Sequence, residues 1–364
     1  MIFCEHCFND KEIASIICAA AASEIGECPV CHCQGHLYNT TDQSELTPYF
    51  EELLNIYTPT SGLPVSYPRA ETRSLIDDLN ERWNIFSQIP RVQIYEILKA
   101  VCSELYADVP ELLDGPVGIP ELYDNSYLKD HALLKNNDWD AFVEEIKTKN
   151  RYHSKLVNFD ILEKYCSFIR KTYKTGELFY RARISGKNGY PPDEMSAPPA
   201  GKSSEGRANA KGITCLYLAS DVDTTLHEVR AGVFDFVCVG AFSLKKDITV
   251  VDLRAIIEIS PFVDGLGYLD HAINKQYLEK LNTEMSKSLR RNDSTLDYVP
   301  TQYIVDFIKS IEHGGKQEYD GIEYNSTTNP GGYNLAIFNP ELFECTSVSV
   351  YNIEKLQYTS KKIR

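Results

Sequence analysis

Two kinds of hydrophobic pattern divide the chain near residue 176. Before that point, apolar residues recur about every 3.6 positions in five segments, which predicts helices at 45–57, 70–86, 92–106, 138–149 and 160–173. Stretches that contain Pro and Gly, such as 58–68 and 114–120, separate these segments. We therefore expect residues 41–175 to form a mainly helical domain, with Trp83 and Trp139 in its core.

After residue 176 short β-rich runs take over. They predict strands at 177–184, 213–219, 234–243, 247–253, 319–325 and 333–340. Helical patterns lie at 222–231, near 270–290 and at 300–312. The Pro-, Ser- and Gly-rich span 186–206 is too long for an ordinary connector, so we expect either a mobile loop or the lid of a site. The pattern predicts an α+β domain over 176–364, with a mixed sheet and peripheral helices.

Cysteine spacing indicates a metal site in residues 1–40. Cys4 and Cys7 form one Cys-x-x-Cys pair, and Cys28 and Cys31 form a second pair twenty residues later. Four thiolates at this spacing are typical of a closed, structural zinc site, in which Zn²⁺ replaces a core too small to exist alone. Residues 9–25 predict a short helix between the pairs, capped by Asn9 or Asp10. His32, Cys33 or His36 could replace one ligand, and reduced cysteines without metal are the alternative.

The net charge of the chain argues against a nucleic-acid partner. The net charge is −15, and all of the acidic excess lies in residues 1–150, which hold 10 Lys and Arg against 25 Asp and Glu. The chain lacks the basic stripe that neutralises phosphates, so we expect no nucleic-acid partner. No apolar stretch is long enough to span a bilayer, and the first residues lack a secretory signal pattern, so we expect no membrane association and a cytoplasmic location.

The stretch 206–230 places three chemically useful side chains at intervals of ten and eleven residues. An arginine such as Arg207 can bind phosphate with two parallel hydrogen bonds, and the ring of Tyr217 can stack on a planar heterocycle. A carboxylate such as Glu228 can stabilise a developing oxocarbenium ion or hold a ribose hydroxyl. Together they fit a dinucleotide that is cut at its glycosidic bond. Taken singly, they fit a solvated loop cation, a half-buried strand residue and a charge on the surface of a helix that Asp221 or Asp223 caps.

These residues belong to a series of motifs that resembles a known domain. The turn Gly206-Arg207-Ala208-Asn209, the strand Leu-Tyr-Leu-Ala at 216–219, Glu228 on its helix, and Ser326 shortly before "GGYNLAIF" follow one another as in the RES domain. The chain resembles toxins of bacterial RES–Xre toxin–antitoxin pairs over residues 177–345. Its paired-cysteine and helical extension resembles that of longer members, the HEPN/RES N-terminal domain proteins. Many members have Trp where this chain has Ala208.

The resemblance implies a fold related to ADP-ribosyltransferase toxins and cleavage of NAD⁺ between nicotinamide and ribose. It implies that Arg207 binds the pyrophosphate or ribose region, Tyr217 packs on the nicotinamide side, and Glu228 holds the ribose and stabilises positive charge. Ser326 would contact the same ribose, and Arg181 is a second phosphate-binding candidate. The implied partners are NAD⁺, inorganic phosphate or water as acceptor, an antitoxin or regulatory protein, and a second copy of the chain, in a toxin–antitoxin or phage-defence setting.

Two other functions stay open at this stage. The same residues would serve a mono-ADP-ribosyltransferase that modifies a protein. The chain could also be a non-enzymatic, zinc-stabilised binding protein, although all four motif positions are intact. We expect the N-terminal 175 residues to restrain or trigger the NAD⁺-consuming domain.

Overall fold

A computed structural model describes residues 1–135, 138–287 and 294–356. The chain forms two compact units: Met1–Asn137 with Ile259–Lys275, and Asp138–Glu258 with Gln276–Arg364. Spatial proximity defines these units rather than independent folding, so the division into domains at 1–40, 41–175 and 176–364 stays a prediction. None of the helices in the described ranges has both the length and the apolar composition that a bilayer span requires.

The cysteine-rich segment of the first unit is built from short elements. Strands β1 (Ile2–Phe3) and β4 (Tyr38–Asn39) pair antiparallel, as do β2 (Ile25–Glu27) and β3 (Gln34–His36). Helix α1 (Lys11–Ala20) begins after Asp10, whose carboxylate accepts hydrogen bonds from the backbone N–H groups of Glu12 and Ile13. Of the two cap candidates, Asp10 is therefore the cap.

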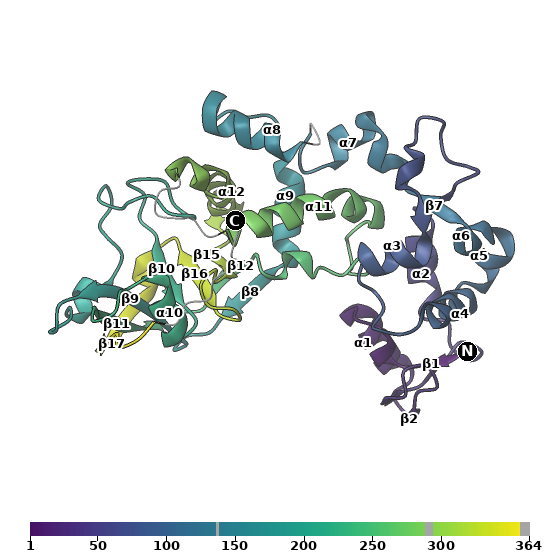
Figure 1. The fold of residues 1–364 in the computed structure, drawn as a ribbon, viewed down its shortest axis with the longest axis horizontal. Coiled ribbons are helices and arrows are strands. Elements are labelled where there is room, and N and C mark those ends of the chain that lie inside the picture. The colour runs from purple at the N-terminus through teal and green to yellow at the C-terminus, as the bar shows by residue number, and fades with distance from the viewer. Residues whose placement is uncertain (136–137, 288–293, 357–364) are drawn as a thin grey trace. The chain divides into compact units, whose positions relative to one another are not determined.

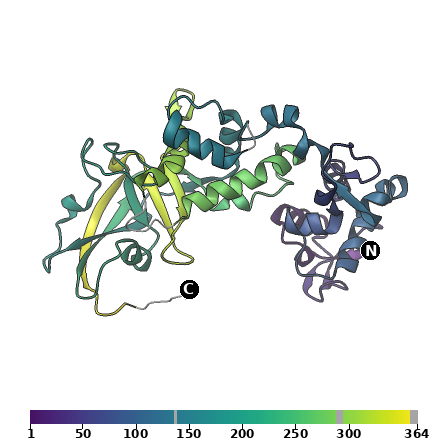
Figure 2. The same cartoon turned by 45° about the horizontal axis from the view of Figure 1, so that its top comes forward.

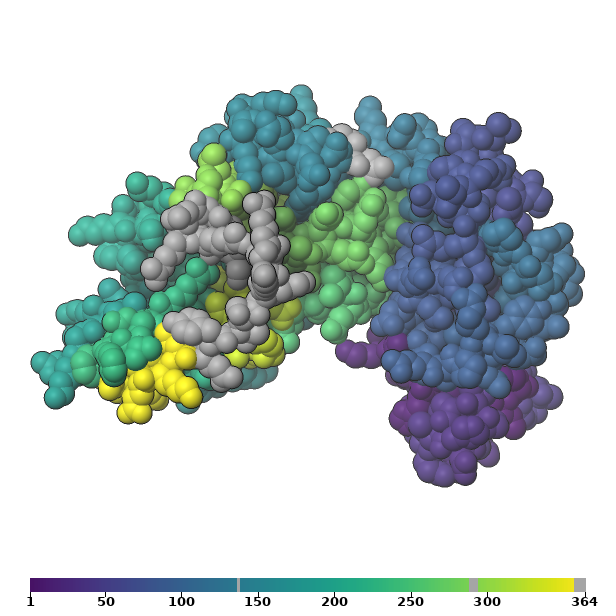
Figure 3. Space-filling model, in the orientation of Figure 1, coloured from purple at the N-terminus to yellow at the C-terminus, as the bar shows by residue number. Residues whose placement is uncertain are grey.

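Helices make up most of the rest of the first unit, together with a three-stranded sheet of order β5-β7-β6. The elements are α2 (Thr47–Leu54), β5 (Thr58–Pro59), β6 (Arg73–Ser74), α3 (Leu75–Glu81), α4 (Arg91–Val101), α5 (Ser103–Asp108), α6 (Glu111–Asp114), β7 (Pro116–Gly118) and α7 (Asn125–His131). Phe8 of the cysteine-rich segment packs on Phe50 and Phe86, with ring centroids 6.3 and 5.1 Å away. The cysteine-rich segment and the helices thus share one core. In Figure 3 the segment (purple) is in contact with the helical part of the same unit (blue).

Both tryptophans are buried, as expected from their apolar surroundings. Trp83 is buried in the first unit and its indole N–H donates to the Tyr57 hydroxyl (2.7 Å). Trp139 is buried in the second unit, at the start of α8 (Trp139–Glu144). Satisfying the indole donor is what allows so large a ring to be buried without an unpaired polar atom.

An eight-stranded sheet organises the second unit, which confirms the α+β class. Its order is β17-β11-β9-β10-β16-β15-β12-β8, and every neighbouring pair is antiparallel except β12 and β15 (Figures 1 and 2). The strands are β8 (Arg170–Tyr173), β9 (Leu178–Ser185), β10 (Leu216–Ala219), β11 (Phe236–Leu244), β12 (Ile248–Asp252), β15 (Gly321–Asn325), β16 (Tyr333–Ile337) and β17 (Phe343–Asn352). A separate hairpin joins β13 (Glu312–His313) to β14 (Lys316–Gln317).

Successive side chains of β11 point to opposite faces of the sheet, and each face is covered by an apolar layer. Val237 and Val239 pack with residues of helix α10 (Val222–Glu228), whereas Cys238 and Phe242 belong to the larger core on the other face. Side chains that alternate along a strand point to opposite faces, so both faces of this strand are covered. Helix α10, whose last residue is Glu228, is thereby packed on the sheet from its first turn to its end.

Some predicted boundaries are wrong. The helix expected over 160–173 ends earlier: α9 covers Phe159–Phe168, and Arg170–Tyr173 form the edge strand β8, paired with β12. Residues 170–173 pair with β12, about 80 residues later in the chain, and this pairing outweighs their local helical pattern. Helix α11 spans Tyr268–Met285 and α12 spans Val299–Ser310; residues 288–290 of the helix expected near 270–290 lie outside the described residues.

The span 186–206 packs against the sheet. It contains a 3₁₀ turn at Pro192–Met195, and the Met195 side chain is fully buried in the core between the strands. The Arg183 guanidinium of β9 donates to the Glu194 carbonyl (2.5 Å). The span therefore contributes core packing in addition to connecting two strands.

A buried ionic network lies near the β8 edge of the sheet. The Glu323 carboxylate is fully buried and accepts hydrogen bonds from the Lys171 ammonium (3.0 Å), the Arg254 guanidinium (2.6 Å) and the Tyr173 hydroxyl. Strands β8, β12 and β15 run side by side here. A buried carboxylate is tolerated only with such partners, so the network fixes how these strands pair.

Candidate functional site

The four cysteines of the two Cys-x-x-Cys pairs converge. The Sγ atoms of Cys4, Cys7, Cys28 and Cys31 all lie within 4.8 Å of one another, at 3.4 Å for Cys4–Cys31 and 3.7 Å for Cys7–Cys28. No pair forms a disulfide. Zn–S bonds of about 2.3 Å place the sulfurs of a tetrahedral site about 3.8 Å apart, so this cluster has the right size to hold a metal ion.

The other candidate ligands lie elsewhere. Cys33 and His32 are exposed, and the Cys33 thiol is directed at the Cys31 carbonyl. The His36 ring contacts the Glu5 carboxylate through Nδ1 (2.9 Å), and the same carboxylate accepts the His36 backbone N–H. Glu5 thereby ties β3 to the segment that follows Cys4.

A tight turn carries Arg207. The Gly206 N–H donates to the Asn209 carbonyl (3.0 Å), and the Tyr217 hydroxyl accepts from the Ala208 N–H (3.0 Å) and donates to the Asn209 side chain (2.6 Å). A Cβ on Gly206 would lie 2.5 Å from that hydroxyl oxygen, so only glycine fits. The Tyr217 hydroxyl thus anchors the turn to strand β10, in addition to any contact its ring makes.

The Arg207 guanidinium points to the end of helix α11. It donates to the backbone carbonyls of Glu284 (3.0 Å) and Lys287. A cation placed there complements the negative end of the helix dipole and satisfies carbonyls that have no partner within the helix. Arg207 is therefore near Tyr217 through its backbone, while its charge is directed away from it.

Glu228 and Ser326 meet, although 98 residues separate them. The Ser326 hydroxyl donates to Glu228 Oε1 (2.6 Å), and the Asn334 side-chain amide donates to the same oxygen (2.9 Å). The serine oxygen itself accepts the backbone N–H of Asn329 (3.1 Å), which directs its proton to the carboxylate. Asp221 caps helix α10 and so positions Glu228 at its last turn. Two donors hold one carboxylate oxygen, and within the described ranges no group hydrogen-bonds the other, which is available to a ligand.

A cavity of about 240 Å³ opens beside Glu228. Strands β9 and β10 share only the pair Tyr180 and Ala219, whereas β9 pairs with β11 along its whole length, so the sheet separates at this point. The lining includes Arg181, Tyr217, Glu228, Tyr324 and Asn334. The cavity therefore has a cation, an anion and two aromatic rings on its walls.

Arg181 is the unpaired charge of this cavity. Its Nε and Nη1 atoms are buried and have no hydrogen-bond partner among the described residues. Burial, with a smaller contribution from Arg183, lowers the pKa of the Arg181 guanidinium to about 10, so it is still cationic at neutral pH. A buried cation without a counterion costs free energy that a bound anion would recover.

The structure brings Arg181, Tyr217, Glu228 and Ser326 together, whereas Arg207 does not line the cavity and its guanidinium is bonded to the carbonyls of Glu284 and Lys287. Sequence reasoning missed Tyr324 and Asn334, which face each other in the register of β15 and β16 and both line the cavity. A polar Asn within the apolar strand 333–337 was the available signal for Asn334. His227 is exposed on α10 and does not line the cavity.

Comparison with known proteins identifies the domain that contains this cavity. A family model described as the RES domain matches residues 178–359, half of the chain. No curated protein and no solved structure matches. The matched range includes every residue that lines the cavity beside Glu228.

Proposed function

The chain belongs to the RES domain family of toxin-like, NAD-related enzymes, and on that basis we propose that it degrades NAD⁺ by cleaving the nicotinamide–ribose bond. The observation that carries the proposal is the cavity in which Glu228, held by Ser326 and Asn334, shares a wall with the unpaired Arg181. A cation for phosphate and a fixed carboxylate for ribose are the two recognition elements that a dinucleotide needs.

Glu228 would act by electrostatics. Cleavage leaves positive charge on the ribose, and a preorganised carboxylate stabilises that charge without moving. Nicotinamide departs from a cationic pyridinium, so no general acid has to protonate it. One carboxylate is therefore enough, in contrast to glycosidases that use a pair.

Arg181 and Arg207 would have different parts in substrate binding. The buried Arg181 guanidinium is available for the pyrophosphate in the state described. For Arg207 to bind phosphate, its guanidinium would exchange the carbonyls of Glu284 and Lys287 for phosphate oxygens. Charge-assisted hydrogen bonds to phosphate are stronger than those to neutral carbonyls, so the exchange is favourable once substrate is present. Tyr217 would support the turn and line the nicotinamide side.

For the cysteine cluster we propose structural Zn²⁺, bound by Cys4, Cys7, Cys28 and Cys31. Four thiolates leave no open coordination position, so the ion would supply folding energy to the first unit and no chemistry.

Purified full-length protein incubated with NAD⁺, with and without inorganic phosphate, tests the activity by mass spectrometry of the products. ADP-ribose 1″-phosphate indicates phosphate as acceptor, and free ADP-ribose indicates water. Adenine-labelled ADP-ribose attached to a protein would instead support a mono-ADP-ribosyltransferase. No consumption of NAD⁺ under any of these conditions would leave the non-enzymatic binding protein as the better reading.

The variant Glu228→Gln tests the role of the carboxylate. It keeps the side-chain shape and removes the charge, so turnover should fall about 10²-fold, the scale of losing one preorganised electrostatic group. Glu341→Gln, an exposed carboxylate far along the same domain, is the matched control. Near-normal loss of NAD⁺ in Glu228→Gln would overturn the assignment.

We also propose that an antitoxin or regulatory protein restrains the enzyme in a bacterial toxin–antitoxin or defence setting, since unrestrained loss of NAD⁺ would harm its own cell. Induced expression of the full chain in a bacterial host should arrest growth and lower cellular NAD⁺. Expression of Glu228→Gln at the same level should do neither. Growth arrest without NAD⁺ loss would contradict this proposal.

A further inference from the structure

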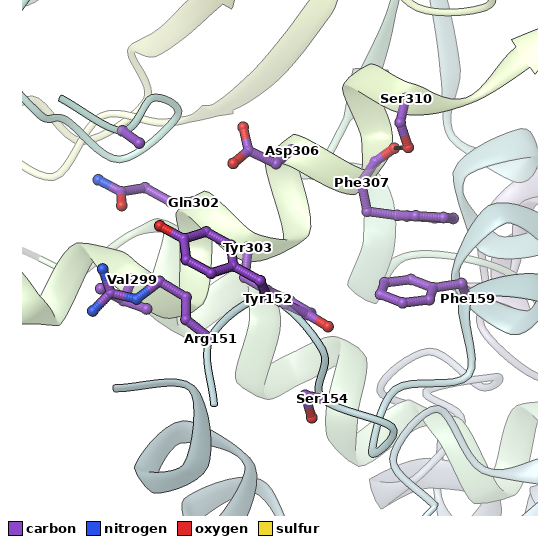
Figure 4. A pocket seen from close by; sticks show the side chains of 11 residues that line it. Arg151, Tyr152, Ser154, Phe159, Val299, Gln302, Tyr303, Asp306, Phe307 and Ser310 are labelled. Atoms are coloured by element: carbon purple, nitrogen blue, oxygen red, sulfur yellow. Dashed lines mark hydrogen bonds between the residues drawn. The ribbon is translucent and has the colours of Figure 1, made fainter. Parts of the chain in front are cut away.

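A second cavity, of about 350 Å³, lies in the same unit but away from Glu228. The loop at residues 151–154 forms one side and helix α12 forms the other (Figure 4). Its volume is within the range of small-molecule sites, about 300–1,000 Å³. It shares no lining residue with the cavity beside Glu228, so the NAD⁺ chemistry does not account for it.

Aromatic rings form much of its wall. Phe159 and Phe307 stack with centroids 4.3 Å apart and an interplanar angle of 26°, and Tyr303 lies 5.9 Å from Phe159. Tyr152, 82% exposed, stands at the mouth, where its ring is accessible to a ligand. An exposed tyrosine beside an aromatic wall favours a planar ring system, because such rings gain by stacking.

Two opposite charges lie on this wall. Among the described residues, no side chain or backbone group hydrogen-bonds the Asp306 carboxylate. Partial burial raises the pKa of that carboxyl, and Lys309 acts against the rise. Arg151 donates through Nε to the Ile146 carbonyl (3.3 Å), and its terminal nitrogens have no partner in the described part of the chain. In the view of Figure 4 the Tyr152 ring is drawn between the Arg151 guanidinium and the Asp306 carboxylate.

We propose that this pocket binds a guanine nucleotide. Its base would stack on Tyr152, its adjacent N1–H and N2–H groups would donate to Asp306, and its phosphate would meet Arg151. An ionised carboxylate only accepts hydrogen bonds, so it selects a base edge with neighbouring donors. Adenine places the N1 acceptor at that position, which a carboxylate repels. Charge at both ends and an aromatic wall between them match a nucleotide rather than an apolar ligand.

The pocket also contacts the turn that carries Arg207. Gln302 lines it, and the Gln302 amide donates to the carbonyls of Gly206 (2.8 Å) and Asn209 (3.0 Å). Ala210, directly after the turn, lines the pocket as well. Occupancy would therefore change the support of the turn and with it the NAD⁺ turnover. This second step rests on the proposed function, whereas binding itself does not.

Calorimetric titration of full-length Glu228→Gln protein tests binding without interference from turnover. Guanosine monophosphate should bind at least about tenfold more tightly than adenosine monophosphate, because adenine keeps the stacking on Tyr152 but loses the hydrogen bonds to Asp306, which correspond to about tenfold or more. Asp306→Asn and Tyr152→Ala should each weaken binding of guanosine monophosphate about tenfold. The matched controls Glu312→Gln and Tyr351→Ala, an exposed carboxylate and a partly exposed tyrosine of the same unit, should bind like the parent.

Several results would overturn the proposal. These are no binding of guanosine monophosphate at millimolar concentration, equal binding of the two nucleotides, or an affinity that neither pocket substitution alters. An arginine-rich peptide that binds where the nucleotide does not would assign the pocket to a protein partner instead. Because no NAD⁺ is cleaved in this assay, its outcome is independent of whether the proposed activity is correct.

Discussion

The contact between Ser326 and Glu228 yields the sharpest prediction. Ser326→Ala removes the hydroxyl that donates to Glu228 Oε1 at 2.6 Å, and leaves the Asn334 amide as the other donor to that oxygen. Without the hydroxyl only the Asn334 amide holds Glu228 Oε1, so the carboxylate is less firmly oriented toward the cavity. We therefore expect Ser326 to act as a positioning residue whose effect on catalysis passes through Glu228.

The size of the effect follows from the kind of hydrogen bond. A hydrogen bond to a charged group contributes about 1.5–3 kcal/mol, and each 1.36 kcal/mol in the barrier is a factor of about ten in rate. If the bond is fully expressed in the transition state, kcat for NAD⁺ loss falls about 10- to 100-fold in Ser326→Ala. KM should change less, since the cation proposed to bind the pyrophosphate is Arg181, which lies on strand β9.

A double-mutant cycle decides whether the effect passes through Glu228. Steady-state kinetics are measured for Ser326→Ala, Glu228→Gln and the double variant, with the exposed Ser349→Ala as control. A residue that only positions Glu228 should add almost nothing once the charge of Glu228 is gone. Additive losses, or a loss below about twofold in Ser326→Ala, would refute the reasoning.

Three further predictions concern stability. Purified protein should contain about one zinc ion per chain by atomic emission. Cys28→Ser should lose the ion and have a lower melting temperature, whereas Cys33→Ser should keep the ion and the parent melting temperature. An ion retained in Cys28→Ser would contradict the four-cysteine site. Burial lowers the pKa of His271 to about 3, so the unfolded chain binds the extra proton between about pH 6.5 and pH 3, and stability falls as the pH falls through this window. Urea titrations should show a loss of about 2 kcal/mol from pH 7 to pH 5 that His271→Gln removes and exposed-site His313→Gln keeps; equal losses in all three would refute it. Glu323→Gln should lower the free energy of unfolding by roughly 3 kcal/mol. This is the low end of the range for breaking a buried ion pair, because the cationic partners of Glu323 reach solvent. A loss below about 1 kcal/mol in the same titration would contradict this prediction.

Local sequence signals predicted the elements of the second unit well. The runs at 177–184, 319–325 and 333–340 contain strands β9, β15 and β16, with ends that differ by up to three residues. The helix expected at 222–231 starts after Asp221, as a cap signal indicates, and ends at Glu228. Such features depend on neighbouring residues, which the sequence displays directly. The strand β17 went unpredicted because "FECTSVSVYN" alternates weakly and gains its stability from pairing with β11.

The site was less predictable because it depends on register and on direction. Tyr324 and Asn334 line the cavity since β15 and β16 pair in one particular register, which no local pattern reveals. The direction of the Arg207 side chain depends on where α11 ends, about eighty residues later. Residue type and motif order indicated the segments that line the cavity, while tertiary structure decides which atoms face it.

Strand β15 has a consequence for how this domain can change during evolution. Neighbouring residues of the strand serve opposite faces, with Glu323 in the ionic network and Tyr324 in the cavity wall. Inserting or deleting one residue before them would exchange the two faces, burying an aromatic ring among cations and directing a carboxylate at the substrate. Point substitutions in β15 can be compensated one at a time, but a change of length cannot. Across diverging relatives we therefore expect length variation to accumulate in the loops, such as 186–206, and strand β15, Gly321–Asn325, to keep its length.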